Sequence, residues 1–511
     1  MNESSKIAQR FCELAISQAH KLAIQFGMPG HTEDFDFAKF WRRVERVTGH
    51  LQSTHGLKVG QRVAWLGLNH ELQLVTLVAC ARLGLIFMPL NFRLALAELQ
   101  SVLQDAKPSI LIHDEMHADA AISLSKAGPP CFQLESLIAS PSSKNLALPV
   151  VNDDADVLLV YTSGTTGLPK GAVHTQAGLL ANAQASHEAH EFNATDIVLS
   201  TLPMFHVGGL CIQTLPALLA GVSVHLHPRF DASAWLHAVS NVEVAKRPTL
   251  SLLVPATMRA VLENVQWPGA NLTSLRGIMA GSSSLPQAYL EKFHERGVPV
   301  GQIYGTTETG PVSVILKFRD AVQRIGFAGW PHAKLELQLI DSEGRAVKQG
   351  AIGEVRVRGT NLMRGYWCAA TQAAKEGLND GWFDTGDMGY LDAQGCLQIV
   401  GRNKDMIISG GENIYPAEIE NALAAFPGLL ECAVVGLPDE RWGEVPVLVL
   451  VRASTAAGQN LSEAAVKTHL EAQIARFKLP RRVVFLDELP KSALGKVQKS
   501  ILQKQMMALN S

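Results

Sequence analysis

Residues 162–171 have the composition of a loop that binds phosphate. The segment contains glycine, hydroxyl and lysine residues: Thr162, Ser163, Gly164, Thr165, Thr166, Gly167 and Lys170. Glycine allows backbone N–H groups to turn toward an anion, hydroxyl groups donate to phosphate oxygens, and lysine adds a positive charge. The Walker A pattern is absent from this segment. The alternative interpretation is a polar surface turn between two strands.

A second cluster, at residues 304–310, places the carboxylate of Glu308 among threonine hydroxyl groups. A carboxylate in such surroundings can hold Mg²⁺ through one or two oxygens while a triphosphate supplies the others. A solvated loop acid is the alternative interpretation for Glu308, and an ordinary core aromatic residue is the alternative for Tyr304.

Several such blocks follow one another in order from about residue 60 onward, and together they resemble the adenylate-forming superfamily. This superfamily comprises acyl-CoA and aryl-CoA synthetases, luciferases and the adenylation domains of peptide synthetases. The resemblance implies an enzyme that uses ATP and Mg²⁺ to convert a carboxylic acid into an acyl adenylate. In the synthetases of the family, CoA then takes the acyl group as a thioester.

The resemblance also assigns roles to individual residues around ATP. Glu308 matches the Mg²⁺ ligand, and Thr166 is a second candidate ligand. Other residues match positions that bind the nucleotide: Gly281, Ser282, Ser283, Tyr304, Gly305, Thr306, Thr307, Asp387 and Arg402. Among these, we expect Tyr304 to lie against adenine, Thr307 to contact phosphate, and Asp387 to accept hydrogen bonds from the ribose hydroxyls.

Further matches concern the acid, CoA and the catalytic step. His206 lies in a block that resembles the acyl pocket, where it could gate the pocket or orient the carboxylate; an ordinary core histidine is an equally weighted alternative. Gly410 and Gly411 resemble the loop that lines the pantetheine tunnel. Lys496 matches the catalytic lysine of the family, and Lys404 matches its hinge position.

The two steps of the reaction place different demands on Lys496. Adenylation joins two anions, the carboxylate and the α-phosphate, and a fixed cation offsets their repulsion. Losing such a preorganised donor costs roughly 10²–10³ in rate. Attack by the CoA thiol needs space instead, so rotation of a C-terminal domain about Lys404 would withdraw Lys496 and bring Gly410 and Gly411 in.

The elements that carry these residues indicate an α/β protein of at least two domains. The chain of 511 residues exceeds the size of a single core, which stops growing near ~250–300 residues. Helical patterns alternate with short apolar runs, which favours layered, mostly parallel sheets. We expect helices at residues 8–26 and 37–51 and strands at 62–66, 110–112, 157–161, 171–174, 222–225, 251–254 and 277–279.

The pattern of apolar and polar residues in the sequence changes near Lys334 and again near Arg402. Alternation of apolar and polar residues at 335–340, 354–358 and 397–400 predicts an antiparallel β subdomain. A smaller α+β segment follows, with helices at 416–425 and 462–476 and strands at 431–436 and 445–452. We therefore expect a large N-terminal domain, residues 1–403, and a small α+β C-terminal domain, residues 404–511, whose mobility the resemblance implies.

Composition excludes several classes of protein. Hydrophobic residues make up 47% and charged residues 18%, and the net charge of −2 argues against nucleic acid as a partner. Seven scattered cysteines without a Cys-x-x-Cys pair favour a reducing cytoplasm over a disulfide scaffold. We expect no signal peptide at the N-terminus and no transmembrane segment, because Arg82, Gly84 and Pro89 interrupt the apolar residues 74–90. Homodimer formation is left open.

The favoured function is that of an AMP-forming acyl-CoA synthetase acting on a fatty or aryl acid. No carrier-protein motif follows Lys496, which disfavours a peptide-synthetase adenylation domain. A different acceptor, or a regulator that binds nucleotide without catalysis, are the alternatives. Dicarboxylic acids are a weaker option because the blocks hold no obvious second cation; Arg276, which flanks Gly281, has no assigned role.

Overall fold

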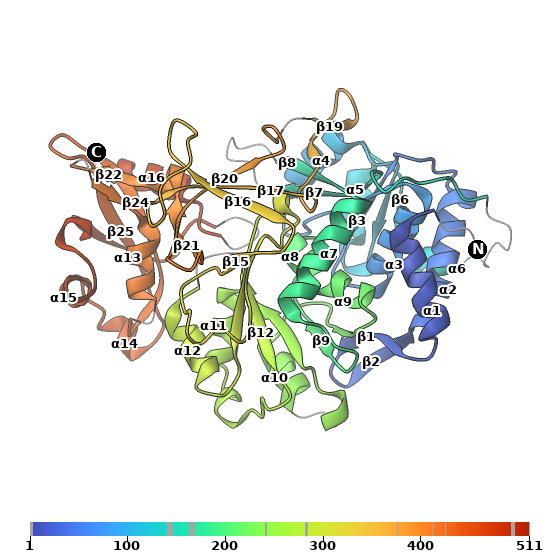
Figure 1. The fold of residues 1–511 in the computed structure, drawn as a ribbon, viewed down its shortest axis with the longest axis horizontal. Coiled ribbons are helices and arrows are strands. Elements are labelled where there is room, and N and C mark those ends of the chain that lie inside the picture. Colours follow the sequence, from blue (N-terminus) through green and yellow to red (C-terminus); the bar gives the residue numbers. More distant parts are fainter. Residues whose placement is uncertain are drawn as a thin grey trace.

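The computed structural model describes residues 4–139, 147–162, 169–240, 243–281, 285–375, 377–410, 412–424, 426–491 and 496–509. A large N-terminal domain contains three sheets, and a small C-terminal domain lies at one end of the molecule, beside the β subdomain (Figure 1). The fold class expected from the sequence is therefore confirmed.

A nine-stranded sheet forms the lower part of the large domain in Figure 1, with the order β15-β14-β13-β12-β11-β9-β10-β1-β2. Its central strands are parallel, and its edge pairs β13–β14, β14–β15 and β1–β2 are antiparallel. The strands are β1 (Leu22–Met28), β2 (His31–Asp36), β9 (Ile197–Ser200), β10 (Ser223–Leu226), β11 (Leu250–Leu253), β12 (Gly277–Gly281), β13 (Val300–Tyr304), β14 (Val314–Leu316) and β15 (Trp330–Pro331).

An eight-stranded sheet forms the second layer, with the order β19-β18-β8-β7-β4-β3-β5-β6. Strands β4, β3, β5 and β6 are parallel to their neighbours, whereas β7–β8, β8–β18 and β18–β19 pair antiparallel. The strands are β3 (Arg62–Leu66), β4 (Ile86–Pro89), β5 (Ile110–His113), β6 (Cys131–Gln133), β7 (Asp156–Thr162), β8 (Lys170–Thr175), β18 (Gly365–Cys368) and β19 (Ala373–Lys375).

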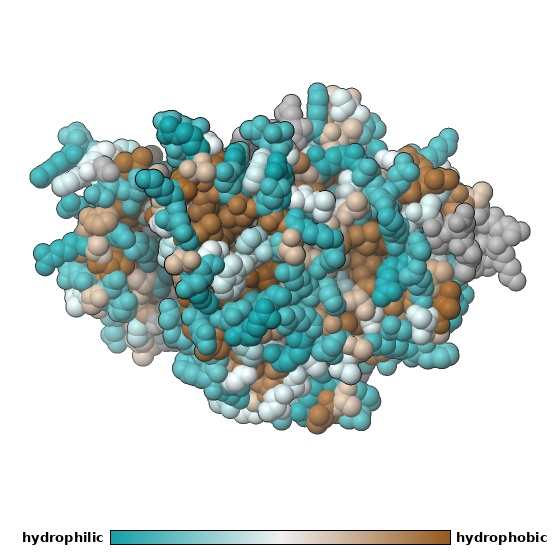
Figure 2. Space-filling model, in the orientation of Figure 1, coloured by the Kyte–Doolittle hydropathy of each residue, from teal (hydrophilic) through white to brown (hydrophobic). Residues whose placement is uncertain are grey.

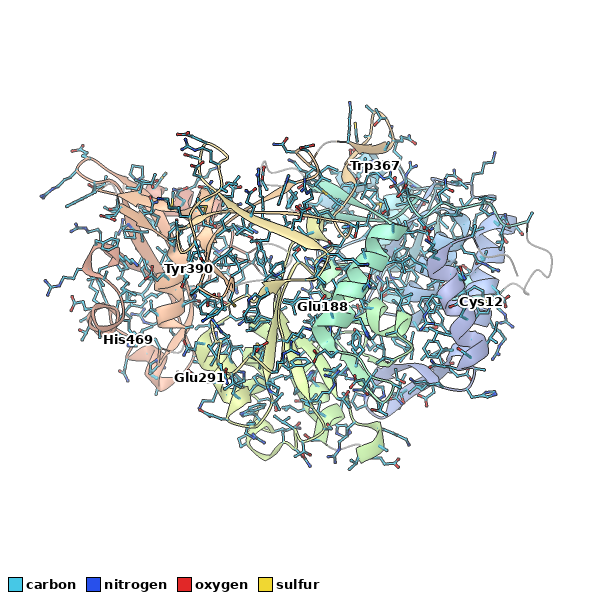
Figure 3. The ribbon with its side chains drawn as sticks, in the orientation of Figure 1. Cys12, Glu188, Glu291, Trp367, Tyr390 and His469 are labelled. Carbon is cyan, nitrogen blue, oxygen red and sulfur yellow. The ribbon has the colours of Figure 1, made fainter. Side chains whose placement is uncertain are left out.

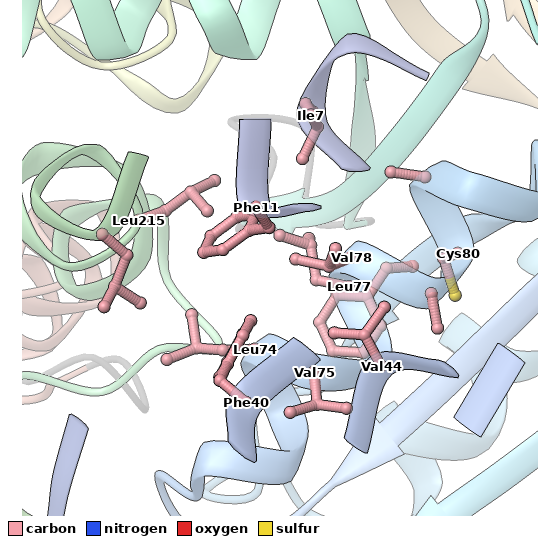
Figure 4. Close-up of a cluster of buried hydrophobic side chains, with 14 of the residues drawn as sticks. Ile7, Phe11, Phe40, Val44, Leu74, Val75, Leu77, Val78, Cys80 and Leu215 are labelled. Atoms are coloured by element: carbon pink, nitrogen blue, oxygen red, sulfur yellow. The ribbon is translucent and has the colours of Figure 1, made fainter. Parts of the chain in front are cut away.

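Buried helices form the main core of the large domain. Every residue of α3 (Glu71–Leu83) is buried, so its apolar residues are not confined to one face. Figure 4 shows Phe11 of α1 (Lys6–Ser17), Phe40 of α2 (Phe37–Gly49) and Leu77 of α3 in one cluster. The other helices of this domain are α4 (Leu96–Ala106), α5 (Ala118–Ser125), α6 (Ser136–Ala139), α7 (Gln176–His190), α8 (Val207–Gly209), α9 (Leu215–Leu219), α10 (Ala232–Ser240), α11 (Pro255–Leu262) and α12 (Gln287–His294).

The predicted helix at residues 8–26 is wrong in its second half. Helix α1 ends at Ser17, and Leu22–Met28 form strand β1 instead. The apolar residues of this segment pair in parallel with β10 and antiparallel with β2. Short apolar runs are ambiguous between helix and strand, and here the pairing partners, which lie far away in the sequence, decide.

The predicted antiparallel β subdomain is present as a four-stranded sheet in the order β16-β17-β20-β21. Figure 1 shows it between the large sheets and the small domain. Its strands are β16 (Leu335–Ile340), β17 (Gly353–Gly359), β20 (Phe383–Leu391) and β21 (Leu397–Arg402).

The small domain has a five-stranded sheet covered by helices. Its elements are β22 (Ile407–Ser409), β23 (Glu412–Ile414), α13 (Pro416–Leu423), β24 (Leu429–Asp439), β25 (Gly443–Arg452), α14 (Ala456–Gln459), α15 (Glu463–Gln473), β26 (Arg482–Leu486) and α16 (Lys499–Ala508). Hydrophilic side chains cover most of the face seen in Figure 2, with apolar residues showing between them. Among the described residues, no helix has both the length and the apolar character needed to cross a bilayer.

Candidate functional site

The candidate phosphate loop connects two antiparallel strands, as the sequence predicts. Thr162 at the end of β7 is paired with Lys170 at the start of β8, and its hydroxyl donates to the Lys170 carbonyl at 3.3 Å. The remaining candidates of this loop lie outside the described residues: Ser163, Gly164, Thr165, Thr166 and Gly167. The hairpin therefore holds the two ends of the loop side by side.

The segment after β13 carries an unpartnered hydroxyl group. Tyr304 ends the strand, and a 3₁₀ turn, η6 (Thr307–Thr309), follows. The Thr306 N–H donates to the Thr309 hydroxyl at 2.9 Å. The Thr306 hydroxyl itself is buried and has no partner among the described residues. A buried hydroxyl is costly to leave unbonded, so this one is available to a ligand or a water molecule.

Asp387 is a buried carboxylate of β20 that is bound by side chains from two other strands. It is 6% exposed and lies opposite Arg402 in the β20–β21 pair, with the Arg402 Nε 3.0 Å from its Oδ1. The Tyr304 hydroxyl donates to its Oδ2 at 2.9 Å. Burial raises the pKa of Asp387, while the charge of Arg402 and the bond from Tyr304 oppose that rise. The three predicted residues therefore form one hydrogen-bonded group.

Lys496 reaches the same group from the small domain. The residue keeps exposed surface, yet surrounding protein atoms remove part of its hydration and lower its pKa. The charge of Arg402 lowers this pKa further, whereas the carboxylates of Asp387 and Glu308 raise it. The charges of Asp387, Glu308 and Arg402 in the large domain therefore act on the lysine of the small domain.

His206 faces Lys496 as a neutral imidazole. It caps the short helix α8, where its Nδ1 accepts a hydrogen bond from the Gly208 N–H at 3.0 Å. Burial lowers the pKa of His206 to about 4, and the charge of Lys496 acts in the same direction. Because Nδ1 is the acceptor, the proton of the neutral ring is on Nε2. His206 thus has one N–H donor, at Nε2, which is compatible with both the orienting interpretation and an ordinary core position.

Glu308 is half-buried and anchored through both its backbone and its side chain. Its carbonyl accepts from the Met363 N–H at 2.7 Å, and its Oε1 accepts from the Tyr366 hydroxyl at 2.9 Å. The Oε2 atom has no hydrogen-bond or ion-pair partner among the described residues. One carboxylate oxygen therefore remains for a ligand.

Chain packing accounts for the glycines among the predicted residues. A Cβ on Gly281 would lie 2.4 Å from the carbonyl oxygen of Ile303, and one on Gly305 would lie 1.8 Å from that of Pro311. Gly410 has a φ of +62°, and a Cβ there would lie 2.6 Å from the ring of Trp442. Ser282, Ser283 and Gly411 lie outside the described residues.

A cavity of about 400 Å³ adjoins the Asp387–Arg402 pair, at the junction of the two domains. It is lined by Thr385, Gly386, Arg402, Asn403 and Lys404. Its volume is within the range of small-molecule sites. The predicted hinge residue Lys404 therefore lines a cavity next to the predicted nucleotide residues.

Two basic residues are committed elsewhere. Arg276 binds the buried Asp196 through Nε and Nη2, at 2.8 and 2.7 Å, and Nη2 also donates to the His190 carbonyl. Lys499, near Lys496 in the sequence, pairs with Glu420 inside the small domain at 2.7 Å. Neither is available as a cation for a substrate.

Sequence reasoning missed Tyr366, which contacts Glu308 and lies near Lys170, with the lysine Nζ 5.2 Å from its ring centroid. An aromatic residue after a buried glycine in a short strand is a weak signal by itself. Its hydrogen bond to Glu308, which is 58 positions away in the sequence, connects Tyr366 with the site.

Two protein families match the chain. Residues 13–367 match the AMP-binding enzyme family, and residues 418–496 match the AMP-binding enzyme C-terminal domain family. The indoleacetate–CoA ligase of Aromatoleum aromaticum is 45% identical over 491 residues, or 94% of each chain. The feruloyl-CoA synthase of an Amycolatopsis species is 38% identical over 95% of this chain and 96% of its own. A long-chain-fatty-acid–CoA ligase of Mycobacterium tuberculosis is 32% identical over 89% and 90% of the two chains.

Solved structures agree with these matches. The o-succinylbenzoate CoA synthetase of Bacillus subtilis, in complex with its acyl-adenylate intermediate, superposes with a TM-score of 0.86 at 29% identity over 97% of each chain. The same synthetase in complex with ATP and a magnesium ion gives a TM-score of 0.84 at 29% identity over 96% of this chain and 98% of its own.

The chain therefore belongs to the AMP-binding enzyme superfamily, in its acyl-CoA ligase branch. Within that branch it is an AMP-forming acid–CoA ligase, which makes an acyl-CoA through an acyl-adenylate intermediate. The predicted family and enzyme class are confirmed.

Proposed function

We propose that this ligase activates an aryl monocarboxylic acid and that Lys496 supplies the cation for its adenylation. The observation that carries the proposal is the convergence of Lys496 with Asp387, Glu308 and the neutral His206. A lysine beside two carboxylates and a cavity of nucleotide size suits a reaction that joins two anions.

The large domain would bind ATP. Asp387 accepts hydrogen bonds from the ribose hydroxyls, and Arg402, 45% exposed beside it, forks onto ribose and phosphate oxygens. The ring of Tyr304 lies against adenine, and the unpartnered Thr306 hydroxyl donates to the nucleotide. The loop at residues 162–171, with Lys170, holds the β- and γ-phosphates, and Thr307 contacts phosphate.

Glu308 would hold Mg²⁺ through the carboxylate oxygen that Tyr366 leaves open. No group of three or more His, Cys, Asp or Glu side chains is placed to bind a metal ion within the described residues. That pattern fits Mg²⁺, which keeps waters and takes one or two carboxylates together with phosphates. Thr166 would be a second protein ligand. When bound, Mg²⁺ neutralises charge on the triphosphate.

In adenylation, a carboxylate oxygen of the acid attacks the α-phosphorus, and the bond from that phosphorus to the bridging oxygen of pyrophosphate breaks. The Lys496 ammonium group offsets the repulsion of the two anions, and the His206 Nε2–H orients the carboxylate. In the second step the CoA thiolate attacks the acyl carbon and AMP leaves. We place the domain boundary at residues 403 and 404, with Lys404 as the hinge that withdraws Lys496 and brings Gly410 and Gly411 to the tunnel.

Three observations favour an aryl monocarboxylic acid. The relatives at 45% and 38% identity are named for indoleacetate and ferulate, which are aryl acids, whereas the fatty-acid ligase is 32% identical. Phe205, next to His206, packs edge-on against Phe92 with ring centroids 5.1 Å apart. The pairing of Arg276 with Asp196 removes that cation from recognition of a second carboxylate.

A panel of acids, assayed by AMP release with CoA present, tests the acid class. We expect kcat/KM to be highest for indole-3-acetate or phenylacetate, lower for ferulate and laurate, and negligible for malonate. A tenfold preference for laurate would replace the aryl assignment with a fatty acid. A preference for malonate would point to Arg93, whose guanidinium lies 5.6 and 5.8 Å from the Phe92 and Phe205 rings.

A further inference from the structure

We propose that Tyr366 is a positioning residue that keeps Glu308 and Lys170 apart and aims each at the triphosphate. The inference rests on the proposed roles of Glu308 and Lys170. It adds to them Tyr366, whose side chain is uncharged. Its hydroxyl donates to Glu308 Oε1 at 2.9 Å, and its ring centroid lies 5.2 Å from the Lys170 ammonium nitrogen.

Strand pairing sets the direction of the Tyr366 side chain. In β18, Tyr366 is opposite Ala172 of β8, the strand that Lys170 begins. Successive side chains of a strand point to opposite faces. The neighbouring Trp367, labelled in Figure 3, packs on one face and donates to the Asp105 carbonyl at 3.3 Å. Tyr366 therefore points to the other face, toward Glu308.

The ring of Tyr366 is held firmly in place. Gly377 has a φ of +107°, and a Cβ added there would come within 3.1 Å of the Tyr366 Cδ2 atom. The segment at residues 363–366, which contains Tyr366, also binds the backbone of Glu308, since the Met363 N–H donates to the Glu308 carbonyl at 2.7 Å. It is also tied to β8, since the Arg364 N–H donates to the Val173 carbonyl at 2.8 Å. One short segment thus holds Glu308 by its main chain and its carboxylate.

The tyrosine prevents an unproductive ion pair. Glu308 and Lys170 carry opposite charges near the same ring, yet within the described parts of the chain neither forms a salt bridge. A direct pair would neutralise both groups before ATP arrived. The Tyr366 hydroxyl occupies one carboxylate oxygen, and the ring face attracts the ammonium group without cancelling its charge.

ATP binding measured by titration calorimetry, without acid or CoA and with Mg²⁺ varied, tests the inference. In Tyr366→Phe, which keeps the ring, we expect the half-saturating Mg²⁺ concentration to rise about tenfold, because outer partners of metal ligands affect metal affinity by ~10–100-fold. ATP affinity without Mg²⁺ should change little. In Tyr366→Leu, which also removes the ring face, ATP affinity without Mg²⁺ should fall by a further ~2- to 5-fold.

Tyr390→Phe is the matched control. Tyr390 is also half-buried and its hydroxyl bonds to Gln398 in the β subdomain; Figure 3 shows it well apart from Trp367, the neighbour of Tyr366. Its Mg²⁺ dependence should match that of the native enzyme. Thermal unfolding of each variant checks the fold, and Tyr366→Phe carries the test if Tyr366→Leu does not fold.

Glu308→Gln distinguishes a failure of the positioning role of Tyr366 from a failure of the proposed role of Glu308 as a metal ligand. If it weakens the Mg²⁺ response and Tyr366→Phe does not, the positioning role is wrong and the proposed function stands. If Glu308→Gln leaves the Mg²⁺ response unchanged, the assignment of Glu308 as the metal ligand fails, and the inference fails with it.

Discussion

The two halves of the site differ in how they are held. In the large domain, Asp387, Arg402 and Tyr304 are joined by strand pairing and direct hydrogen bonds. Lys496 comes from the small domain, where an isolated bridge between Lys491 and Val497 fixes the chain next to it. The half that we propose binds the nucleotide is therefore held together within one domain, whereas the position of the lysine depends on how the two domains meet. The difference suits an enzyme that needs the lysine in only one of its two steps.

We expect the largest effect from Lys496→Ala, which removes the charge that the small domain contributes to the site. We expect adenylation, measured as acid-dependent ATP–pyrophosphate exchange, to fall by roughly 10²–10³ because the cation between the two anions is lost. Conversion of a supplied acyl adenylate to the thioester should persist. Lys499→Ala is the control, since Lys499 pairs with Glu420 inside the small domain. An equal fall in both half-reactions would contradict a role confined to adenylation.

Asp387→Ala should weaken both ATP binding and the stability of the large domain. The change removes the carboxylate that binds Arg402, whose side chain is 45% exposed, and Tyr304, whose hydroxyl also donates to Thr385. A hydrogen bond to a charged group contributes about 1.5–3 kcal/mol, a factor of about 10–150 in binding, so we expect ATP affinity, measured by calorimetry, to fall by about that factor and the melting temperature to drop. Glu336→Ala, which removes an exposed partner of Arg358, should change neither. Unchanged ATP affinity in Asp387→Ala would exclude Asp387 from the nucleotide site.

The pH dependence should separate the two half-reactions. Loss of hydration and the charge of Arg402 lower the pKa of Lys496, so in the free enzyme the lysine loses its proton, and its useful charge, below the ordinary pKa of lysine. The kcat/KM for ATP in adenylation, which reports the free enzyme, should fall on the alkaline side at that lower pH. In kcat the fall should occur at higher pH, because bound phosphates favour the charged form. A thioester-forming step with the same alkaline limb as adenylation would argue against this assignment.

A smaller effect is expected at the contact between the domains. The Arg259 guanidinium of α11 donates to the Leu430 carbonyl of β24, and its Nε binds Glu263 at 2.7 Å. Removing a partly exposed hydrogen bond costs about 0.5–1.5 kcal/mol, so Arg259→Ala should slow adenylation by ~2- to 10-fold. Thioester formation from a supplied adenylate should not slow. Glu263→Ala, which keeps the contact with the small domain, is the control, and equal rates in Arg259→Ala and the native enzyme would show that this contact does not hold Lys496 in place.

Local pattern was sufficient for many elements and for the family. Strand β3 matches its predicted bounds, and two short apolar runs predict the strands β7 and β8, whose antiparallel pairing only the structure shows. The predicted helix at residues 8–26 failed because strand β1 depends on pairing with β10, about 200 residues away, which periodicity within a short window does not detect.

The sequence by itself determined the family and the reaction class, because ordered blocks of glycines, hydroxyls and charges lie within short segments of the chain. Only the tertiary structure decided which charges remain available. Arg276 binds Asp196, 80 positions away, and Tyr366 binds Glu308, 58 positions away. Such pairs depend on strand register and domain arrangement. For the same reason, Lys496 and Lys499, three positions apart in the sequence, differ in their surroundings: one faces Asp387 across the domain junction and the other is paired with Glu420.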